Sequence, residues 1–369
     1  MRVIFAGGGT GGHLYPGLAI ARALVKEDRR VEPFFIGARR GIEREVLPQV
    51  GFPFELLDLH PLYRSRIWEN WKTVRGALTA WRRIGREVRS EPPVCIVGTG
   101  GYAAGLALGY AALHHIPIVL QEQNTYPGIT ARFFSRYAAQ VHLGFPEGRA
   151  YLSQSSKAQV FDSGNPIEPP PADAFDKAAG RTRWQFPPTG GAVLLVYGGS
   201  QGAQAINGAV SSWIERGLPS DLYVIWATGK SNYEKLARFE SERVRVRAYI
   251  APISAAYRAA DFALSRAGAM ATAELCAWGI PAILIPLPTA AADHQTANAK
   301  ALALAGAAEM IPQSELTTDT LSSAVGELVT DSAKLSAMKA KALERARPSA
   351  AVDIARHILS MTDLKQNRA

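Results

Sequence analysis

Short β-branched runs alternate with longer Ala- and Leu-rich runs along most of the chain. Runs of the first kind predict buried strands, and the apolar positions at helical spacing between them predict helices. Strands are expected in both halves of the chain, at residues 2–6, 33–36, 94–98, 118–121, 140–143, 192–197, 222–227, 244–248, 262–265 and 282–285. Strands that alternate with helices form parallel sheets covered on both faces, so an α/β protein is predicted.

A proline-rich segment, residues 164–171, separates the two halves. Proline interrupts helices and sheets alike, so this segment is predicted to be a linker, with the domain boundary near residue 164. The length of 369 residues also suits two domains better than one core. Residues 2–13 and 192–203 form a weak internal repeat of strand, glycine loop and helix. Ligands of such folds bind at the carboxyl ends of the strands, which places the expected site in a cleft between two facing sheets.

Charge and cysteine content narrow the class of protein. The net charge of +9 favours an anionic partner such as phosphate, nucleic acid or an anionic membrane. The two cysteines, Cys95 and Cys276, lie in apolar stretches, which excludes a disulfide scaffold and a cysteine-based zinc site. Residues 92–121 carry no charged side chain, but their glycines and Pro117 favour strand, turn, helix and strand over a transmembrane span.

Two glycine loops are candidates for phosphate binding. The loop at 198–203 follows a predicted strand and precedes a helix, so its N–H groups suit a phosphate, although a simple tight turn is the alternative. The loop at 7–13 contains the dinucleotide fingerprint, and Arg39 and Arg40 keep an NADP site open. Alternatively, this loop makes room for a bulky acceptor and presents His13, which is either a general base or a structural histidine.

Two motifs in the second half suit sugar or ribose hydroxyls. Glu274 lies in an apolar helical run, where a carboxylate needs partners and either accepts ribose hydroxyls or caps a neighbouring element. Asp293 is predicted to be a helix N-cap, followed by His294, Gln295 and Asn298 on the first turns. The amides suit sugar hydroxyls, and a capped surface helix is the alternative. No cluster of metal ligands occurs, so a helix N-terminus and N–H groups would hold a leaving diphosphate.

Residues 61–90 combine tryptophans with basic side chains. Five apolar residues recur at helical spacing: Trp68, Trp71, Val74, Leu78 and Trp81. Eight basic residues, Arg75 and Arg82 among them, stand against two acidic ones. This pattern favours a helix that binds a membrane surface over an ordinary core-facing helix, and nucleic acid fits less well.

Taken together, the motifs resemble those of the MurG family. They occur in the family's order at 8–13 (Gly-Gly-Thr-Gly-Gly-His), 100–102 (Gly-Gly-Tyr), 121–124 (Gln-Glu-Gln-Asn), 164–166 (Gly-Asn-Pro), 198–203 (Gly-Gly-Ser-Gln-Gly-Ala), 265–268 (Ser-Arg-Ala-Gly) with Glu274, and 293–298 (Asp-His-Gln-x-x-Asn). They span nearly the whole chain, and the ordered set is far more specific than any single motif.

The resemblance implies a GT-B fold, in which two Rossmann-like domains face a deep interdomain cleft. Residues 1–163 would bind the acceptor and the membrane, with a helix at about 348–362 packed back on them, and residues 164–347 would bind UDP-GlcNAc. The expected reaction is inverting transfer of GlcNAc, without metal or other cofactor, from UDP-GlcNAc to the C4 hydroxyl of MurNAc in lipid I. The product, lipid II, serves peptidoglycan synthesis, cell shape and cell division. The expected location is peripheral, on the cytoplasmic face of the plasma (inner) membrane, with cell-wall synthesis proteins as partners and no nucleic acid.

The family's donor contacts correspond to one set of residues here. They are Thr10, Gly11, Gly12, Asn124, Ser200, Gln201, Gly202, Ile250, Glu274, His294 and Gln295. Ser200 and Gln201 would meet the diphosphate, Ile250 the uracil through its backbone, and Glu274 the ribose. Gln295, with His294 beside it, would contact the GlcNAc.

The acceptor side corresponds to Thr10, His13, Tyr102 and Asn124, and His13 is the candidate base. One departure from the family is that Ile167 and Glu168 follow Gly-Asn-Pro, where an arginine near the diphosphate is often found.

Three other functions stay open. A related GT-B enzyme would glycosylate diacylglycerol. An NADP oxidoreductase would bind NADPH at the first loop and no UDP at the second. A silent nucleotide-sugar-binding protein would bind UDP-GlcNAc without turnover.

Overall fold

The computed structural model describes the chain except for residues 59–69, 156, 199–202 and 367–369. The chain divides into two compact units. The first comprises Met1–Ile167 together with Ser349–Ala369, and the second comprises Glu168–Pro348. The division falls at the end of the Gly-Asn-Pro motif, a few residues after the boundary expected near 164.

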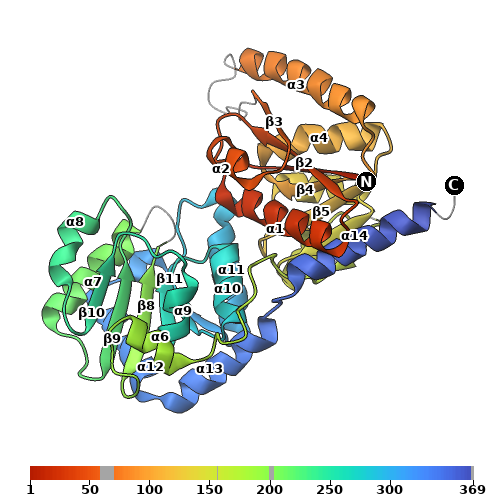
Figure 1. Ribbon diagram of the computed structural model, residues 1–369. Helices are drawn as coiled ribbons and strands as arrows, with labels where there is room; N and C mark the ends of the chain where they lie inside the picture. The colour runs from red at the N-terminus through yellow and green to blue at the C-terminus, as the bar shows by residue number, and fades with distance from the viewer. Residues whose placement is uncertain (59–69, 156, 199–202, 367–369) are drawn as a thin grey trace. The chain divides into compact units, whose positions relative to one another are not determined.

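The first unit is a parallel sheet covered by helices. Its main elements are β1 (Arg2–Gly7), α1 (Gly11–Glu27), β2 (Glu32–Ala38), α2 (Glu43–Val50), β3 (Phe54–Leu57), α3 (Asn70–Ser90), β4 (Cys95–Gly100), α4 (Gly101–Leu113), β5 (Ile118–Glu122), α5 (Ile129–Phe134), β6 (Gln140–Leu143), β7 (Gln159–Phe161) and α14 (Ala350–Gln366). In the described part of the chain, its seven strands lie in the order β3-β2-β1-β4-β5-β6-β7 (Figure 1). The carboxyl ends of these strands therefore meet at one edge of the sheet.

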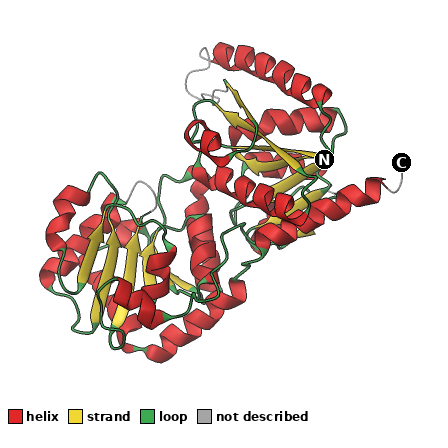
Figure 2. Cartoon of the chain, viewed as in Figure 1, coloured by secondary structure: helices red, strands yellow, loops and turns green. Residues whose placement is uncertain are grey.

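The core of the first unit lies on both faces of its sheet. Successive side chains of a strand point to opposite faces, so β1 contributes to two clusters. Ile4 packs with buried side chains of α3 and α4, whereas Val3 and Phe5 pack with α1 and α14. Figure 2 shows these helices on the two sides of the strands. The result is the three-layer arrangement predicted by the alternation of strands and helices.

The last helix of the chain belongs to the first unit. Ile354, Ala355 and Ile358 of α14 are buried in the cluster that contains α1. Arg356 adds an exposed ion pair to Glu27 at the end of α1, with 2.9 Å between Nε and Oε2. The amphipathic helix predicted at about 348–362 therefore forms, and it continues to Gln366.

The second unit is also a parallel sheet between helices. Its main elements are α6 (Lys177–Arg183), β8 (Ala192–Tyr197), α7 (Gln204–Arg216), β9 (Leu222–Ala227), α8 (Tyr233–Leu236), β10 (Val244–Arg247), α9 (Ser254–Ala259), β11 (Phe262–Ser265), α10 (Ala269–Ala277), β12 (Ala282–Leu284), α11 (His294–Leu304), β13 (Ala308–Met310), α12 (Thr318–Thr330) and α13 (Ser332–Arg345). Among the residues that the structure describes, its strands follow the order β10-β9-β8-β11-β12-β13. Both units thus place their first strand, β1 or β8, in the sheet interior, directly before a glycine loop.

All the predicted strands form, and the structure adds β3, β7 and β13. These three strands lie at sheet edges. Edge strands are half exposed, so their sequences lack the continuous apolar run that marks an interior strand.

The uncharged segment 92–121 forms β4, α4 and β5, as predicted. Among the described residues, we find no helix with the length and hydropathy that crossing a bilayer requires.

Candidate functional site

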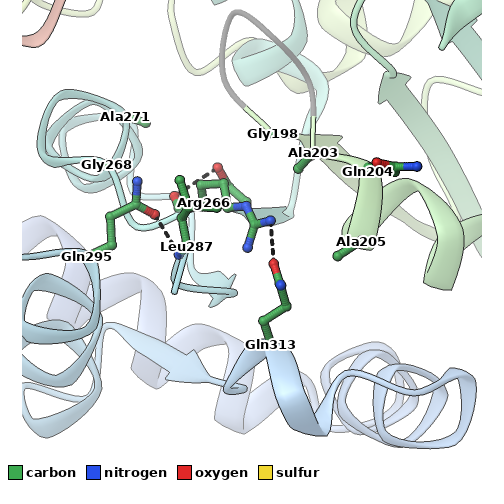
Figure 3. A pocket seen from close by; sticks show the side chains of 11 residues that line it. Gly198, Ala203, Gln204, Ala205, Arg266, Gly268, Ala271, Leu287, Gln295 and Gln313 are labelled. Carbon is green, nitrogen blue, oxygen red and sulfur yellow. Dashed lines mark hydrogen bonds between the residues drawn. The ribbon is translucent and has the colours of Figure 1, made fainter. Parts of the chain in front are cut away.

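A cavity of about 600 Å³ opens at the carboxyl ends of β8, β11 and β12 in the second unit (Figure 3). We call it the donor cavity, because the resemblance described above leads us to expect the sugar donor in this unit. It is lined by Gly198, Ala203, Gln204, Ala205, Ser265, Arg266, Gly268, Ala271, Leu287, Gln295 and Gln313. Its volume lies within the usual range for small-molecule sites, and its position is the usual one for ligands of open parallel sheets.

The two described ends of the second glycine loop border this cavity. Gly198 and Ala203, on either side of the loop, both line it, and Gln204 and Ala205 begin α7 there. Ser200, Gln201 and Gly202 lie outside the described residues. The first turn of a helix presents unpaired N–H groups and a positive partial charge, so this end of the cavity favours an anion.

Arg266 brings a positive charge to the donor cavity. Its side chain is buried and donates hydrogen bonds to the carbonyl oxygens of Ile285 and Pro286 at 3.0 and 3.1 Å. It also donates to Oε1 of Gln313 at 2.6 Å (Figure 3). Burial lowers the pKa of Arg266 from its usual value, but a guanidinium stays charged in proteins. The three acceptors are neutral, so the charge of Arg266 is available to attract an anion.

Sequence reasoning gave Arg266 and Gln313 no role. Arg266 belongs to the Ser-Arg-Ala-Gly motif at 265–268. A charged residue directly after an apolar strand is the feature that could have identified it as a site residue. Gln313 follows β13, which the sequence pattern did not predict.

The Asp-His-Gln-x-x-Asn motif at the start of α11 places Gln295 in the donor cavity and Asn298 in the core. Gln295 lines the cavity, and its Oε1 accepts a hydrogen bond from the backbone N–H of Leu287 at 3.0 Å. His294 is half-buried, and its Nδ1 lies 2.7 Å from the carbonyl oxygen of Ala291. Asn298 is fully buried and donates to the carbonyl oxygen of Ala267 at 3.1 Å, so its amide supports the fold.

The N-cap prediction for Asp293 is wrong in its detail. Asp293 occupies the N-cap position of α11, but its backbone is left-handed and its carboxylate accepts no N–H of the helix. Instead, Oδ1 accepts a hydrogen bond from the hydroxyl of Thr296 at 2.6 Å. The left-handed backbone departs from the extended conformation in which an N-cap side chain normally reaches N2 or N3.

Glu274 lies in a separate pocket of about 170 Å³ in the second unit, with Glu168, Ile253 and Tyr257 among its lining residues. The hydroxyl of Tyr257 donates to Oε2 of Glu274 at 2.7 Å, and the hydroxyl of Tyr197 lies 3.3 Å from that of Tyr257. Burial raises the pKa of Glu274, the Tyr257 hydrogen bond opposes this, and the charge of Glu168 adds to it. Ile250, the predicted uracil contact, is buried shortly after β10.

His13 lies at the carboxyl end of β1 in the first unit, half-buried on the first turns of α1. Its Nδ1 lies 3.3 Å from the carbonyl oxygen of Gly8 and 3.2 Å from the hydroxyl of Thr10. A carbonyl oxygen only accepts, so the bond to Gly8 needs the proton on Nδ1 and puts the basic lone pair on Nε2. A Cβ on Gly100 would lie 2.8 Å from Cδ2 of His13, so glycine there admits the ring.

Asn124 is held by a buried hydrogen-bond network. Its backbone N–H and its side-chain amide both donate to Oε1 of Glu122, at 3.0 and 3.3 Å. Burial raises the pKa of Glu122. The neighbouring side chains of Gln123 and Asn165 bond to the backbone of Thr99 and of Gln123, respectively. The Gln-Glu-Gln-Asn and Gly-Asn-Pro motifs are therefore one structural unit.

Tyr102 lies on the first turn of α4, and its side chain is outside the described part.

The described part of helix α3 packs on the core through small and branched side chains. Among its described side chains, the buried hydrophobic ones are Ala80, Ile84 and Val88. Trp81 packs edge-on against Tyr110, with 5.1 Å between ring centroids, whereas Leu78 is exposed. Arg82 is also exposed. Trp68 and the side chains of Trp71 and Arg75 lie outside the described residues.

No group of three or more His, Cys, Asp or Glu side chains placed to hold a metal ion occurs in the part of the chain that the structure describes.

Family models identify the class of protein to which this fold belongs. Residues 3–143 match the glycosyltransferase family 28 N-terminal domain, and residues 193–354 match the glycosyltransferase family 28 C-terminal domain. The protein is therefore a glycosyltransferase with the GT-B fold.

Individual relatives show which family of glycosyltransferases the chain belongs to. A Chlorobaculum parvum protein named UDP-N-acetylglucosamine--N-acetylmuramyl-(pentapeptide) pyrophosphoryl-undecaprenol N-acetylglucosamine transferase is 39% identical, over 98% of this chain and 100% of its own. A Salinibacter ruber protein of the same name is 38% identical, over 98% and 97%. The crystal structure of Acinetobacter baumannii MurG matches with a TM-score of 0.78 and 28% identity, over 97% of this chain and 99% of its own. The chain belongs to the MurG family.

Proposed function

We propose that this protein transfers GlcNAc from UDP-GlcNAc to the C4 hydroxyl of MurNAc in lipid I and so forms lipid II for peptidoglycan. The observation that carries the donor assignment is the cavity at the strand ends of the second unit, where the start of α7 and Arg266 favour an anion and Gln295 offers an amide. The names of the relatives, which join UDP-GlcNAc to a pyrophosphoryl-undecaprenol acceptor, support the choice of donor and acceptor.

The proposed reaction is a single displacement. Nε2 of His13 takes the proton of the C4 hydroxyl as its oxygen attacks the anomeric carbon. The bond from that carbon to the diphosphate oxygen breaks, and UDP leaves with the bonding electrons. The start of α7 and the guanidinium of Arg266 offset the negative charge that develops on the leaving group. Attack opposite the leaving group turns an α-linked donor into a β-linked product.

The direct test supplies radiolabelled UDP-GlcNAc and a short-chain lipid I analogue to the purified protein. Label in the lipid product is the expected result. Diacylglycerol in place of the analogue is the control acceptor and is expected to remain unlabelled. Label on diacylglycerol alone would move the protein to the related lipid glycosyltransferases, and binding of UDP-GlcNAc without any product would make it a silent binder.

Metal independence is a separate part of the proposal. The helix N-terminus and Arg266 would hold the charge that Mg²⁺ offsets in many other transferases. We expect EDTA to leave the transfer rate within about twofold of the untreated rate. A loss of more than about tenfold that added Mg²⁺ restores would contradict this part while leaving the acceptor assignment intact.

Glu274 is proposed to accept the two ribose hydroxyls of UDP, which requires its charged form. UDP affinity is therefore expected to fall as the pH falls through the raised pKa of Glu274 in the free protein. Tyr257→Phe removes the hydrogen bond that lowers this pKa, so the midpoint of the affinity loss is expected at a higher pH than in the wild type. Glu168→Gln removes a repelling charge, so its midpoint is expected at a lower pH.

Calorimetric titration of UDP between about pH 4 and pH 8 measures these midpoints. Tyr233→Phe, which removes the hydroxyl of an exposed tyrosine in the same unit, is the matched control. Identical midpoints in the wild type and Tyr257→Phe would show that the carboxylate does not control UDP binding.

We also propose that the first unit binds the cytoplasmic face of the plasma membrane through the outer surface of α3, α4 and α5. Helices α3 and α5 flank α4, because Trp81 and Phe134 both approach Gly109. Five apolar side chains of this layer and the turn after it are between 49% and 71% exposed: Leu78, Leu113, Ile129, Phe133 and Tyr137. Arg82 and Arg136 lie among them, and the guanidinium of Arg136 lies 5.0 Å from the ring centroid of Phe133. Apolar side chains with basic neighbours favour an anionic membrane surface.

The double variant Leu78→Glu, Phe133→Glu is expected to reduce binding to phosphatidylglycerol vesicles by at least about tenfold, because it removes apolar contacts and repels the anionic surface. Vesicle flotation measures the bound fraction. Leu304→Glu, at a 90% exposed position of the second unit, is the matched control and is expected to bind as the wild type does. Equal binding of the double variant would exclude this surface.

A further inference from the structure

The carboxyl group of Glu43 is buried beneath the first glycine loop. Glu43 begins α2 and has no exposed surface. Its Oε1 accepts hydrogen bonds from the backbone N–H groups of Gly9 at 2.7 Å and Ala38 at 3.4 Å. Its Oε2 is buried, and no partner for it occurs among the described residues. A carboxyl group in this position is held by the loop and not by a counter-ion in the described chain.

Glycines surround this carboxyl group because nothing larger fits. A Cβ on Gly8 would lie 1.3 Å from Oε1, and a Cβ on Gly41 would lie 1.9 Å from Oε2. A Cβ on Gly37 would lie 2.9 Å from Cγ of Glu43. Glycines in a loop of this kind normally let the backbone approach a phosphate. Here Gly8 gives way to a side chain of the same chain, and Gly37 and Gly41 complete the cage.

The same loop holds His13. Gly8, whose α-carbon lies against Glu43, accepts the Nδ1–H of His13 through its carbonyl oxygen. The N–H of Gly8 donates to the carbonyl oxygen of Gly100 at 3.3 Å, and Gly100 lies against the imidazole ring. Any shift of Gly8 and Gly9 therefore moves the acceptor that fixes the orientation of His13.

We propose that Glu43 is a positioning residue, a buried carboxyl group that holds Gly8 and Gly9 in place and so fixes the Gly8 carbonyl and with it the imidazole of His13. The effect on His13 rests on the proposed function, because it assumes that His13 acts as the base.

Amide hydrogen exchange tests the loop directly and needs no activity. Exchange of the peptide that covers residues 7–14 is followed by mass spectrometry in the wild type, Glu43→Gln and Glu43→Ala. The alanine variant loses both hydrogen bonds, so its loop amides are expected to exchange at least about tenfold faster. Glutamine keeps an acceptor oxygen without the charge, so an intermediate rate is expected. Glu45→Gln, at an exposed position of the same helix, is the control.

The outcomes separate the role of Glu43 in the loop from its effect on His13. Unchanged exchange in a folded Glu43→Ala protein would overturn the role of Glu43 in the loop. Glu43→Gln is expected to lower kcat by about 10- to 100-fold with an unchanged KM for UDP-GlcNAc and an unchanged melting temperature, because a small displacement of a catalytic group has this effect. An equal kcat would overturn the effect on His13, whereas a wild type without any transfer would refute the proposed function and leave exchange to decide the loop.

Discussion

His13→Ala is expected to lower the rate of GlcNAc transfer by about 10²- to 10⁴-fold, the usual contribution of a general base. UDP affinity is expected to stay within about twofold of the wild type, because the donor cavity belongs to the second unit and His13 to the first. A quenched transfer assay gives the rate, and calorimetry with UDP gives the affinity. A lower transfer rate with unchanged UDP affinity would show that His13 acts in catalysis and not in donor binding.

The control for this variant is an exposed histidine of the same unit. His115 has a left-handed backbone, with φ of 54°, which asparagine adopts readily, so His115→Asn removes an imidazole at little structural cost. Its transfer rate is expected to match the wild type. If His13→Ala also transfers GlcNAc within about twofold of the wild-type rate, His13 is not the base.

Glu274→Ala is expected to raise the Kd for UDP by at least about 100-fold, because it removes the acceptor of two ribose hydrogen bonds. Hydrogen bonds to a charged group contribute about 1.5–3 kcal/mol each, and 1.4 kcal/mol is a factor of ten in affinity. The loss is expected to disappear for a nucleotide without ribose hydroxyls, so 2′,3′-dideoxy-UDP should bind the wild type and the variant with similar affinity. Glu234→Gln, at an exposed position of the same unit, is the control. Unchanged affinity of Glu274→Ala for UDP would remove Glu274 from the ribose site.

The interior of each sheet could be predicted because its strands are buried on both faces. Strands such as β1 and β8 are continuous apolar runs, and each is followed by a glycine loop that the sequence also shows. The edge strand β13 has only three residues, one of them Glu309, and its pattern does not differ from that of a loop. Pattern analysis therefore gave the fold class and missed only strands at the margins.

A site residue could be predicted where the local sequence alone indicates its function. Gln295 was placed at a ligand site by its amide and its position on a first turn, and it does line the donor cavity. Arg266 was not assigned a role, because its partners Ile285 and Gln313 come from other strands and turns. Glu43 was missed for the same reason: its glycine cage combines Gly37 and Gly41, which shortly precede it, with the distant Gly8, and its sequence neighbours give no sign of burial.

The spacing of apolar residues in α3 predicts an apolar face but not which part of that face a neighbouring helix covers. Leu78 and Trp81 are three residues apart and were assigned to one face, but Leu78 is exposed and Trp81 is packed against Tyr110. Regular spacing identifies a stripe on a helix, and only the neighbouring helix decides which part of the stripe is covered.

The chemical structure of the product tests most directly whether this protein transfers GlcNAc to MurNAc of lipid I by a single displacement. The purified protein is incubated with UDP-GlcNAc and a lipid I analogue, and the disaccharide product is analysed by NMR. One new GlcNAc is expected on the C4 oxygen of MurNAc, with the large anomeric proton coupling of a β linkage. A small coupling would contradict the single displacement, and linkage to another oxygen, or no product at all, would contradict the assignment of donor and acceptor.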